Sequence, residues 1–185
     1  KEKRLRSVMT YKKGYFIKLW AVRVILIALI ALWMSTIFGF SAENGEQSQS
    51  LSDKITVQVV HILKSDYEDM NVKAKEEYFN TVSFFVRKTG HFGEYGILGV
   101  LISTFLLTFE KIRNKKRYIV ILITTIIGMV YASSDEVHQN FVEGRSPKVM
   151  DVCIDATGCF MGVVFVTIIC FLICRRKRKK CGRII

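Results

Sequence analysis

The sequence LWAVRVILIALIALWMSTIFGF, from Leu19 to Phe40, decides the fold class. Its 22 residues are apolar apart from Arg23 and a few small or hydroxyl-bearing residues. At 1.5 Å per residue a helix of this length reaches across a hydrocarbon core about 30 Å thick. The stretch therefore predicts a membrane-spanning helix, with Trp20 in the interfacial belt and Arg23 extended toward the lipid headgroups.

Three further apolar stretches are long enough to cross a bilayer. The chain has 185 residues, 50% of them hydrophobic, and a net charge of +12, which is typical of a small membrane protein whose charges lie outside the bilayer. We expect an all-α membrane protein with four transmembrane helices. The expected parts are a basic N-terminal segment (1–18), a four-helix transmembrane domain (19–175) with spans at about 19–40, 91–109, 118–139 and 151–174, and a basic tail (176–185).

The segment 41–90, between the first two spans, is too polar to cross the membrane. Two amphipathic stretches follow its polar start. The first places Ile55, Val59 and Ile62 at helical spacing, and the second runs from about residue 72 to residue 86. We expect both to form short extracytoplasmic helices that lie over the bundle.

Basic residues are distributed unevenly between the two sides of the bundle. The two ends of the chain and the hinge 110–117 hold 19 basic and two acidic residues, whereas the loops 41–90 and 140–150 hold eight basic and nine acidic ones. The positive-inside rule then predicts cytoplasmic termini. Because each basic run adjoins an apolar span, we expect contacts with anionic lipid and none with nucleic acid.

Charged side chains gather where the second, third and fourth spans reach the outer surface. Ionisable groups at membrane depth are costly and usually functional. Glu94, Asp135 and Asp155 lie about 22 to 28 Å along their helices from the cytoplasmic ends, so we expect one outer-leaflet site. The candidate residues are His91, Glu94, Asp135, His138 and Asp155 for catalysis, and Arg87, Lys88, Gln139, Arg145 and Asp151 for ligand binding.

Helical spacing brings a pair of glycines onto the face that carries the last two carboxylates. Asp151, Asp155, Gly158 and Gly162 share one stripe of the fourth span. The two glycines form a small-xxx-small pair, which predicts the close approach of another helix. Glu136, in contrast, lies off the stripe that Asp135 begins, so we expect no functional role for it.

These residue types allow several chemistries. Mixed nitrogen and oxygen ligands suit zinc, manganese or magnesium, although no metalloprotease motif is present. Buried carboxylates and histidines suit general acid–base catalysis. Alternatively, Arg87, Lys88 and Arg145 suit the binding of a phosphate group. A purely structural network, with Glu94 or Asp135 paired to Arg145, is also consistent with the sequence.

Three ordered motifs in this sequence resemble those of the VanZ-like family, over about residues 20–175. The motifs are Arg87-Lys88-x-x-His91-Phe92-x-Glu94-Tyr95-x-x-Leu98-Gly99, Ser134-Asp135-Glu136-x-His138-Gln139-x-Phe141-x-x-Gly144-Arg145, and Asp151-Val152-x-x-Asp155-x-x-Gly158-x-x-x-Gly162. The resemblance implies a small multi-pass protein of the bacterial cell membrane. The namesake of the family is associated with resistance to the glycopeptide antibiotic teicoplanin.

Together, the residues and the resemblance favour an envelope protein whose outer polar site binds a membrane lipid or a lipid-linked cell-wall precursor. The alternative is an intramembrane hydrolase or transferase that acts on a lipid head group, with or without a metal. A transporter is a third hypothesis, which four spans would support only in a homo-oligomer. Catalytic activity and the use of a cofactor both stay open at this point.

Overall fold

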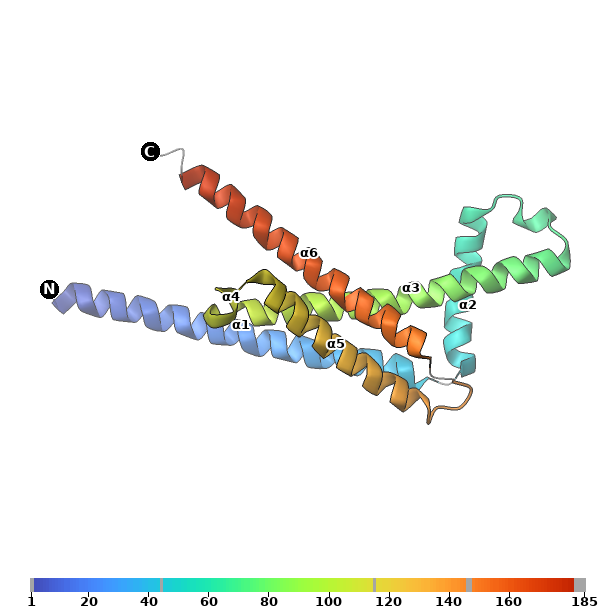
Figure 1. Ribbon diagram of the computed structural model, residues 1–185, viewed down its shortest axis with the longest axis horizontal. Helices are drawn as coiled ribbons and strands as arrows, with labels where there is room; N and C mark the ends of the chain where they lie inside the picture. Colours follow the sequence, from blue (N-terminus) through green and yellow to red (C-terminus); the bar gives the residue numbers. More distant parts are fainter. Residues whose placement is uncertain (1, 44, 115, 146–147, 182–185) are drawn as a thin grey trace.

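The chain folds into a bundle of long helices in the computed structural model, which describes residues 2–43, 45–114, 116–145 and 148–181. No strand occurs in these ranges. The start of α1 and the end of α6 lie at one end of the long axis, and α2 lies across the other end (Figure 1). The elements are α1 (Glu2–Ala42), α2 (Gly45–Leu63), the 3-10 turn η1 (Tyr67–Asp69), α3 (Val72–Leu107), α4 (Glu110–Arg113), α5 (Arg117–Gln139) and α6 (Val149–Cys181).

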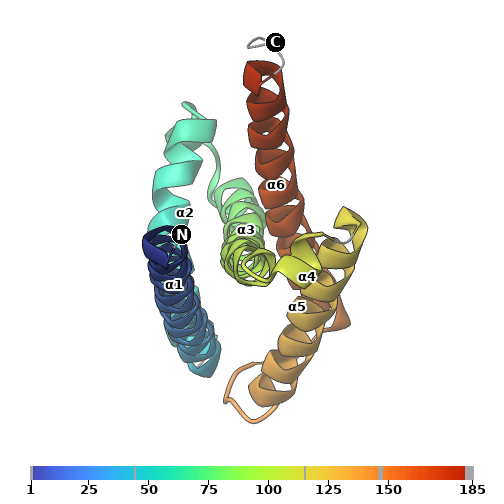
Figure 2. The same ribbon diagram turned by 90° about the vertical axis from the view of Figure 1, so that its left-hand side faces the viewer.

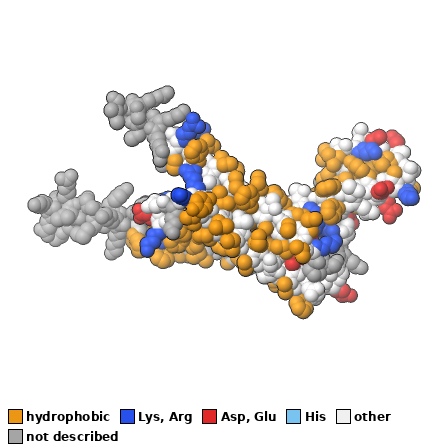
Figure 3. All heavy atoms as spheres, viewed as in Figure 1, with side chains coloured by type: hydrophobic (Ala, Val, Ile, Leu, Met, Phe, Trp, Pro, Cys, Tyr) orange, Lys and Arg blue, Asp and Glu red, His pale blue; other side chains and the backbone are white. Residues whose placement is uncertain are grey.

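Four helices of the described chain are long and apolar enough to cross a membrane, which confirms the predicted fold class. They are the segments Phe16–Ala42, Val72–Leu107, Arg117–Gln139 and Val149–Arg176. Apolar side chains cover the middle of the face shown in Figure 3, and acidic side chains gather where α2 connects to α3. This distribution matches a bundle whose middle faces lipid and whose ends face water.

The structure has one helix, α3, where the sequence predicted two. The expected surface helix (about 72–86) and the expected second span (91–109) form a single helix of 36 residues that ends at Leu107. The Asn71 side chain caps its start by accepting a hydrogen bond from the Ala74 N–H at 2.9 Å. The helix continues through residues 87–90, where Arg87 and Lys88 are good helix formers, and Lys88 forms an ion pair with Asp151 of α6.

This length gives α3 two roles. At 1.5 Å per residue it extends about 54 Å, well beyond a hydrocarbon core of about 30 Å. Its N-terminal half packs against α2, where Val60 and Val82 are both buried. Its C-terminal half is the centre of the bundle, with α1 on one side and α5 and α6 on the other (Figure 2).

Glycines bring α3 and α6 into backbone contact. A Cβ atom at Gly158 would lie 2.2 Å from the Phe92 carbonyl oxygen, and one at Gly162 would lie 2.1 Å from that of Gly96. Both distances are far below van der Waals contact, so only glycine fits at these positions. The predicted small-xxx-small pair is confirmed, and its partner helix is α3.

Side-chain hydrogen bonds to carbonyl groups tie α1 to this central helix. Arg23 donates from Nε to the Thr108 hydroxyl at 3.1 Å and from Nη2 to the Thr108 carbonyl at 3.0 Å. The Arg23 guanidinium therefore satisfies groups at the C-terminal end of α3, in addition to the headgroup contact that the sequence predicted. Nearer the other end, Trp33 Nε1 donates to the Glu94 carbonyl at 2.9 Å.

Candidate functional site

A cavity of about 150 Å³ lies where α1, α2, α3 and α5 meet, at the end of the bundle away from the termini. It brings together five of the ten predicted site residues: three from α3, one from α5 and one from the connection that follows α5. Apolar side chains of α1, α2 and α3 complete the walls. The ionisable lining residues are Arg87, His91, Glu94, Asp135, Arg145 and Glu43, and the apolar ones are Ile37, Phe40, Leu51, Ile55 and Val86.

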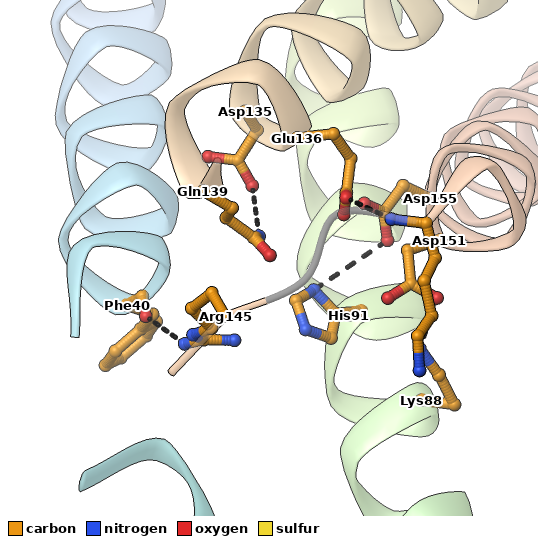
Figure 4. Close-up of polar contacts among 10 residues, drawn as sticks. Phe40, Lys88, His91, Asp135, Glu136, Gln139, Arg145, Asp151 and Asp155 are labelled. Carbon is orange, nitrogen blue, oxygen red and sulfur yellow. Dashed lines mark hydrogen bonds and ion pairs between the residues drawn. The ribbon is translucent and has the colours of Figure 1, made fainter. Parts of the chain in front are cut away.

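His91 connects this cavity to a buried carboxylate of α6. Its Nδ1 lies 3.9 Å from Asp155 Oδ1, and the Asp155 side chain is only 1% exposed. Figure 4 shows the His91 ring directed toward Asp155. Neither atom has a hydrogen-bond partner among the described residues. Since 3.9 Å is too long for a hydrogen bond, a small movement or a bound molecule would be needed to satisfy both groups.

Lys88 and Asp151 form an ion pair beside the cavity. Their side chains are 10% and 14% exposed, so the pair is largely shielded from solvent. Neither residue lines the cavity. The pair joins α3 to the first turn of α6, directly above the glycine contacts, and therefore fixes the register of these two helices.

Arg145 lines the cavity and also holds the end of α1. Its Nε donates to the Glu43 carbonyl at 3.1 Å. Its Nη2 donates to the Phe40 carbonyl at 3.0 Å (Figure 4). The preceding Gly144 has a φ of 74°, a left-handed conformation that suits glycine and reverses the chain toward α1. Burial lowers the pKa of the Arg145 guanidinium, which still stays charged at neutral pH.

Asp135 of α5 also lines the cavity, and it is 2% exposed. Its Oδ2 accepts a long hydrogen bond of 3.4 Å from Gln139 Nε2, one turn further along α5. Its Oδ1 has no hydrogen-bond partner in the part of the chain that the structure describes. A buried carboxylate that is only partly satisfied is available to a ligand that donates hydrogen bonds.

A scan against protein-family models matches VanZ/LLP1 over residues 26–172, which is more than half of the chain. The protein belongs to the VanZ/LLP1 family. Neither the search of curated proteins nor the search of solved structures found a match. The three motifs that carry the resemblance to VanZ/LLP1 proteins lie within the matched range.

The cavity of this VanZ/LLP1 protein does not include every predicted residue. His138 lies on the side of α5 that faces α1, where its ring stacks on Phe38 with centroids 4.1 Å apart. Gln139 and Asp155 contact residues of the cavity but do not line it. The site residues thus divide into a group that lines the cavity and a group that supports it.

Glu136, for which the sequence predicted no functional role, belongs to the supporting group. It is 6% exposed, and its Oε2 accepts a hydrogen bond from the Lys148 backbone N–H at 2.9 Å. This bond holds the connection between α5 and α6, which carries Arg145. Helical spacing did not indicate a role for Glu136, because this residue lies off the stripe of Asp135. The only sequence signal for Glu136 was its place in the second motif.

In the described part of this VanZ/LLP1 protein, no group of three or more His, Cys, Asp or Glu side chains has the arrangement of a metal site. The cavity lining offers hydrogen-bond donors, hydrogen-bond acceptors and side chains of opposite charge. Two guanidinium groups suit an anion, whereas three carboxylates and an imidazole suit hydroxyl groups or a proton. The combination suits a polar headgroup better than a simple ion.

Proposed function

We propose that this protein binds the phosphate-bearing headgroup of a membrane lipid, or of a lipid-linked cell-wall precursor, in the cavity between α1, α2, α3 and α5. It would act in the outer leaflet of a bacterial cell membrane, with both termini in the cytoplasm. The distribution of basic residues supports this orientation.

The observation that carries the proposal is the mixed lining of the cavity. Charged side chains converge from four separate segments, and next to them lie Ile37, Leu51 and Ile55. Leu51 and Ile55 are each nearly half exposed, so the apolar wall extends to the molecular surface. A lipid requires this combination, because its headgroup is charged and the first part of its chains is apolar.

Arg87 is the residue that we expect to contact the phosphate first. Its Nη1 lies 3.5 Å from Gln49 Oε1, a distance at the limit of a hydrogen bond. Arg145 uses two N–H groups on the carbonyl oxygens of Phe40 and Glu43 and retains others of its five donors. Lys88 is held by Asp151 and would contribute only to the local potential.

Lipid binding can be tested with a polyprenyl phosphate, with the uncharged polyprenol as the comparison ligand. Native mass spectrometry of the purified protein would give the bound fraction of each. Loss of a hydrogen bond to a charged group costs about 1.5 to 3 kcal/mol, so Arg87→Gln should weaken phosphate binding about tenfold to about 150-fold. The control is Lys54→Gln, which removes the same charge from an exposed position of α2 that does not line the cavity.

The proposal predicts that Lys54→Gln binds like the wild type. Equal loss in both variants would mean that net charge, and not the cavity, attracts the ligand. Equal binding of polyprenol and polyprenyl phosphate would show that the protein does not recognise the phosphate. Either result would contradict the proposal.

Resistance to teicoplanin is the biological consequence that the family suggests. A protein that holds an outer-leaflet lipid or precursor could lower the access of a lipoglycopeptide to the cell wall. Cells that express the wild-type chain should then tolerate more teicoplanin than cells that express Arg87→Gln at the same level. Unchanged susceptibility on expression of the wild type would exclude this role for this chain.

A second candidate function, hydrolysis or transfer on a lipid head group, is favoured by the contact between His91 and Asp155. A carboxylate that orients an imidazole toward a cavity is the arrangement of a general base, and such contacts are often long in the absence of substrate. Turnover of polyprenyl or phospholipid substrates that is abolished by both His91→Ala and Asp135→Asn would support an enzyme. Lipid binding without turnover would support the first proposal.

A further inference from the structure

A second hollow, of about 230 Å³, lies at the opposite end of the bundle, where α1 begins and α6 ends. It is formed by the end of α3, the short helix α4 and the facing sides of α5 and α6. Its lining residues include Leu107, Arg113, Arg117, Val120, Cys170 and Ile173. No residue of the three polar motifs lines this hollow, which is therefore distinct from the site already described.

The hollow combines an apolar wall with positive charge. Its permanently charged lining residues are both arginines, and its described lining includes no carboxylate. Arg117 is held in place across the hollow: Nη1 donates to the Thr167 carbonyl at 3.1 Å, and the guanidinium carbon lies 5.3 Å from the centre of the Phe171 ring. Since a guanidinium carries five N–H donors, most of them stay available to a ligand.

The position of Arg117 on α5 indicates the depth of the hollow in the membrane. Arg117 and Gln139 are the two ends of α5, which at 1.5 Å per residue lie about 33 Å apart. This distance spans a hydrocarbon core of about 30 Å. The hollow therefore faces the leaflet opposite the first cavity, at the level of lipid phosphates. Exposed apolar residues of α6 beside it, Leu172 and Ile173, are suited to lipid chains.

We propose that this hollow binds one anionic phospholipid from the leaflet on the side of the termini. The lipid phosphate lies between Arg113 and Arg117, and the first part of an acyl chain lies along Leu107, Val120 and Ile173. A volume of about 230 Å³ is below that of ordinary ligand pockets, so it takes this part of the lipid and leaves the chain ends in the bilayer. Basic hollows between membrane helices select anionic headgroups in this way.

Thiol labelling tests the proposal, because Cys170 lines the hollow whereas the exposed Cys153 lies near the other end of α6. The protein is placed in phosphatidylcholine nanodiscs with and without phosphatidylglycerol, treated with a maleimide and analysed by peptide mass spectrometry. We expect phosphatidylglycerol to slow labelling of Cys170 at least about threefold and to leave Cys153 unchanged. Equal rates at Cys170 in both lipids would overturn the proposal.

Matched variants separate a built site from general attraction to a basic surface. Arg113→Gln removes a charge from the lining of the hollow, whereas Lys111→Gln removes one from an exposed position of the same short helix that does not line it. Arg113→Gln should abolish the protection of Cys170, and Lys111→Gln should preserve it. Loss of protection in both variants would show a diffuse charge effect and contradict a specific site.

Two further outcomes are decisive. Protection by inorganic phosphate alone, in pure phosphatidylcholine, would show an anion site without lipid recognition and would overturn the proposal. The cavity variant Arg87→Gln should leave the protection of Cys170 intact, because the two sites face opposite leaflets. Failure of the outer site would therefore not be mistaken for failure of this one.

Discussion

Replacement of Gly158 by alanine should separate α3 from α6 and lower the stability of the bundle. The new Cβ atom would lie 2.2 Å from the Phe92 carbonyl oxygen, whereas ordinary contact begins at 3.4 Å, so the helices must move apart by roughly 1.2 Å at this point. Such overpacking costs about 1 to 3 kcal/mol. The higher helix propensity of alanine returns about 1 kcal/mol of this.

Gly93→Ala is the matched control, because a Cβ atom there would have no other atom within 4 Å. It shares the gain in helix propensity but not the clash, so the difference between the two variants isolates the clash at about 1 to 3 kcal/mol. Unfolding in mixed micelles with increasing dodecyl sulfate, followed by circular dichroism, measures this difference. Equal stability of Gly158→Ala and Gly93→Ala would refute the close contact between α3 and α6.

Three other predictions concern groups that hold the helices together. Asp151→Asn leaves the buried Lys88 ammonium without its partner and should destabilise the protein by about 3 to 5 kcal/mol in the same unfolding assay; the double change to two apolar residues should recover most of this loss. Arg145→Gln removes two charged hydrogen bonds from the end of α1 and should cost about 1.5 to 3 kcal/mol per bond, with increased proteolysis of the connection after Ala42. Arg23→Gln removes the hydrogen bonds to Thr108 at the end of α3 and should lower the stability by a similar amount. A loss of stability below about 0.5 kcal/mol in either arginine variant would show that these hydrogen bonds contribute little.

Much of the fold follows from local sequence properties. Hydropathy located four spans because an apolar stretch of about 20 residues has few alternatives to crossing a membrane. The spacing of Gly158 and Gly162 predicted a close helix contact, and the structure identifies its partner as α3. The break expected before residue 91 was wrong, because Arg87 and Lys88 are good helix formers and the helix continues through them. Asp151, which forms the ion pair with Lys88, is 63 residues away in the sequence, so no local pattern indicated this contact.

The site could be predicted only in part for the same reason. Asp135 and His138 are three residues apart and therefore lie on one side of α5, but one side of a helix can face two neighbours. In the structure Asp135 lines the cavity, whereas His138 stacks on Phe38 of α1. Arg145 was expected to hold a phosphate or to pair with a carboxylate, and no local pattern indicated that it would also hold carbonyl groups at the end of α1.

The central claim is that α3, α5 and the connection after α5 together build one binding cavity. A double-mutant cycle with Arg87→Gln and Asp135→Asn, read out as affinity for a polyprenyl phosphate, tests it most directly. Residues that act on one bound ligand should show an interaction energy of about 0.5 to 3 kcal/mol, of either sign. Effects that add within about 0.3 to 0.5 kcal/mol would show that the two residues act independently and would contradict a shared site.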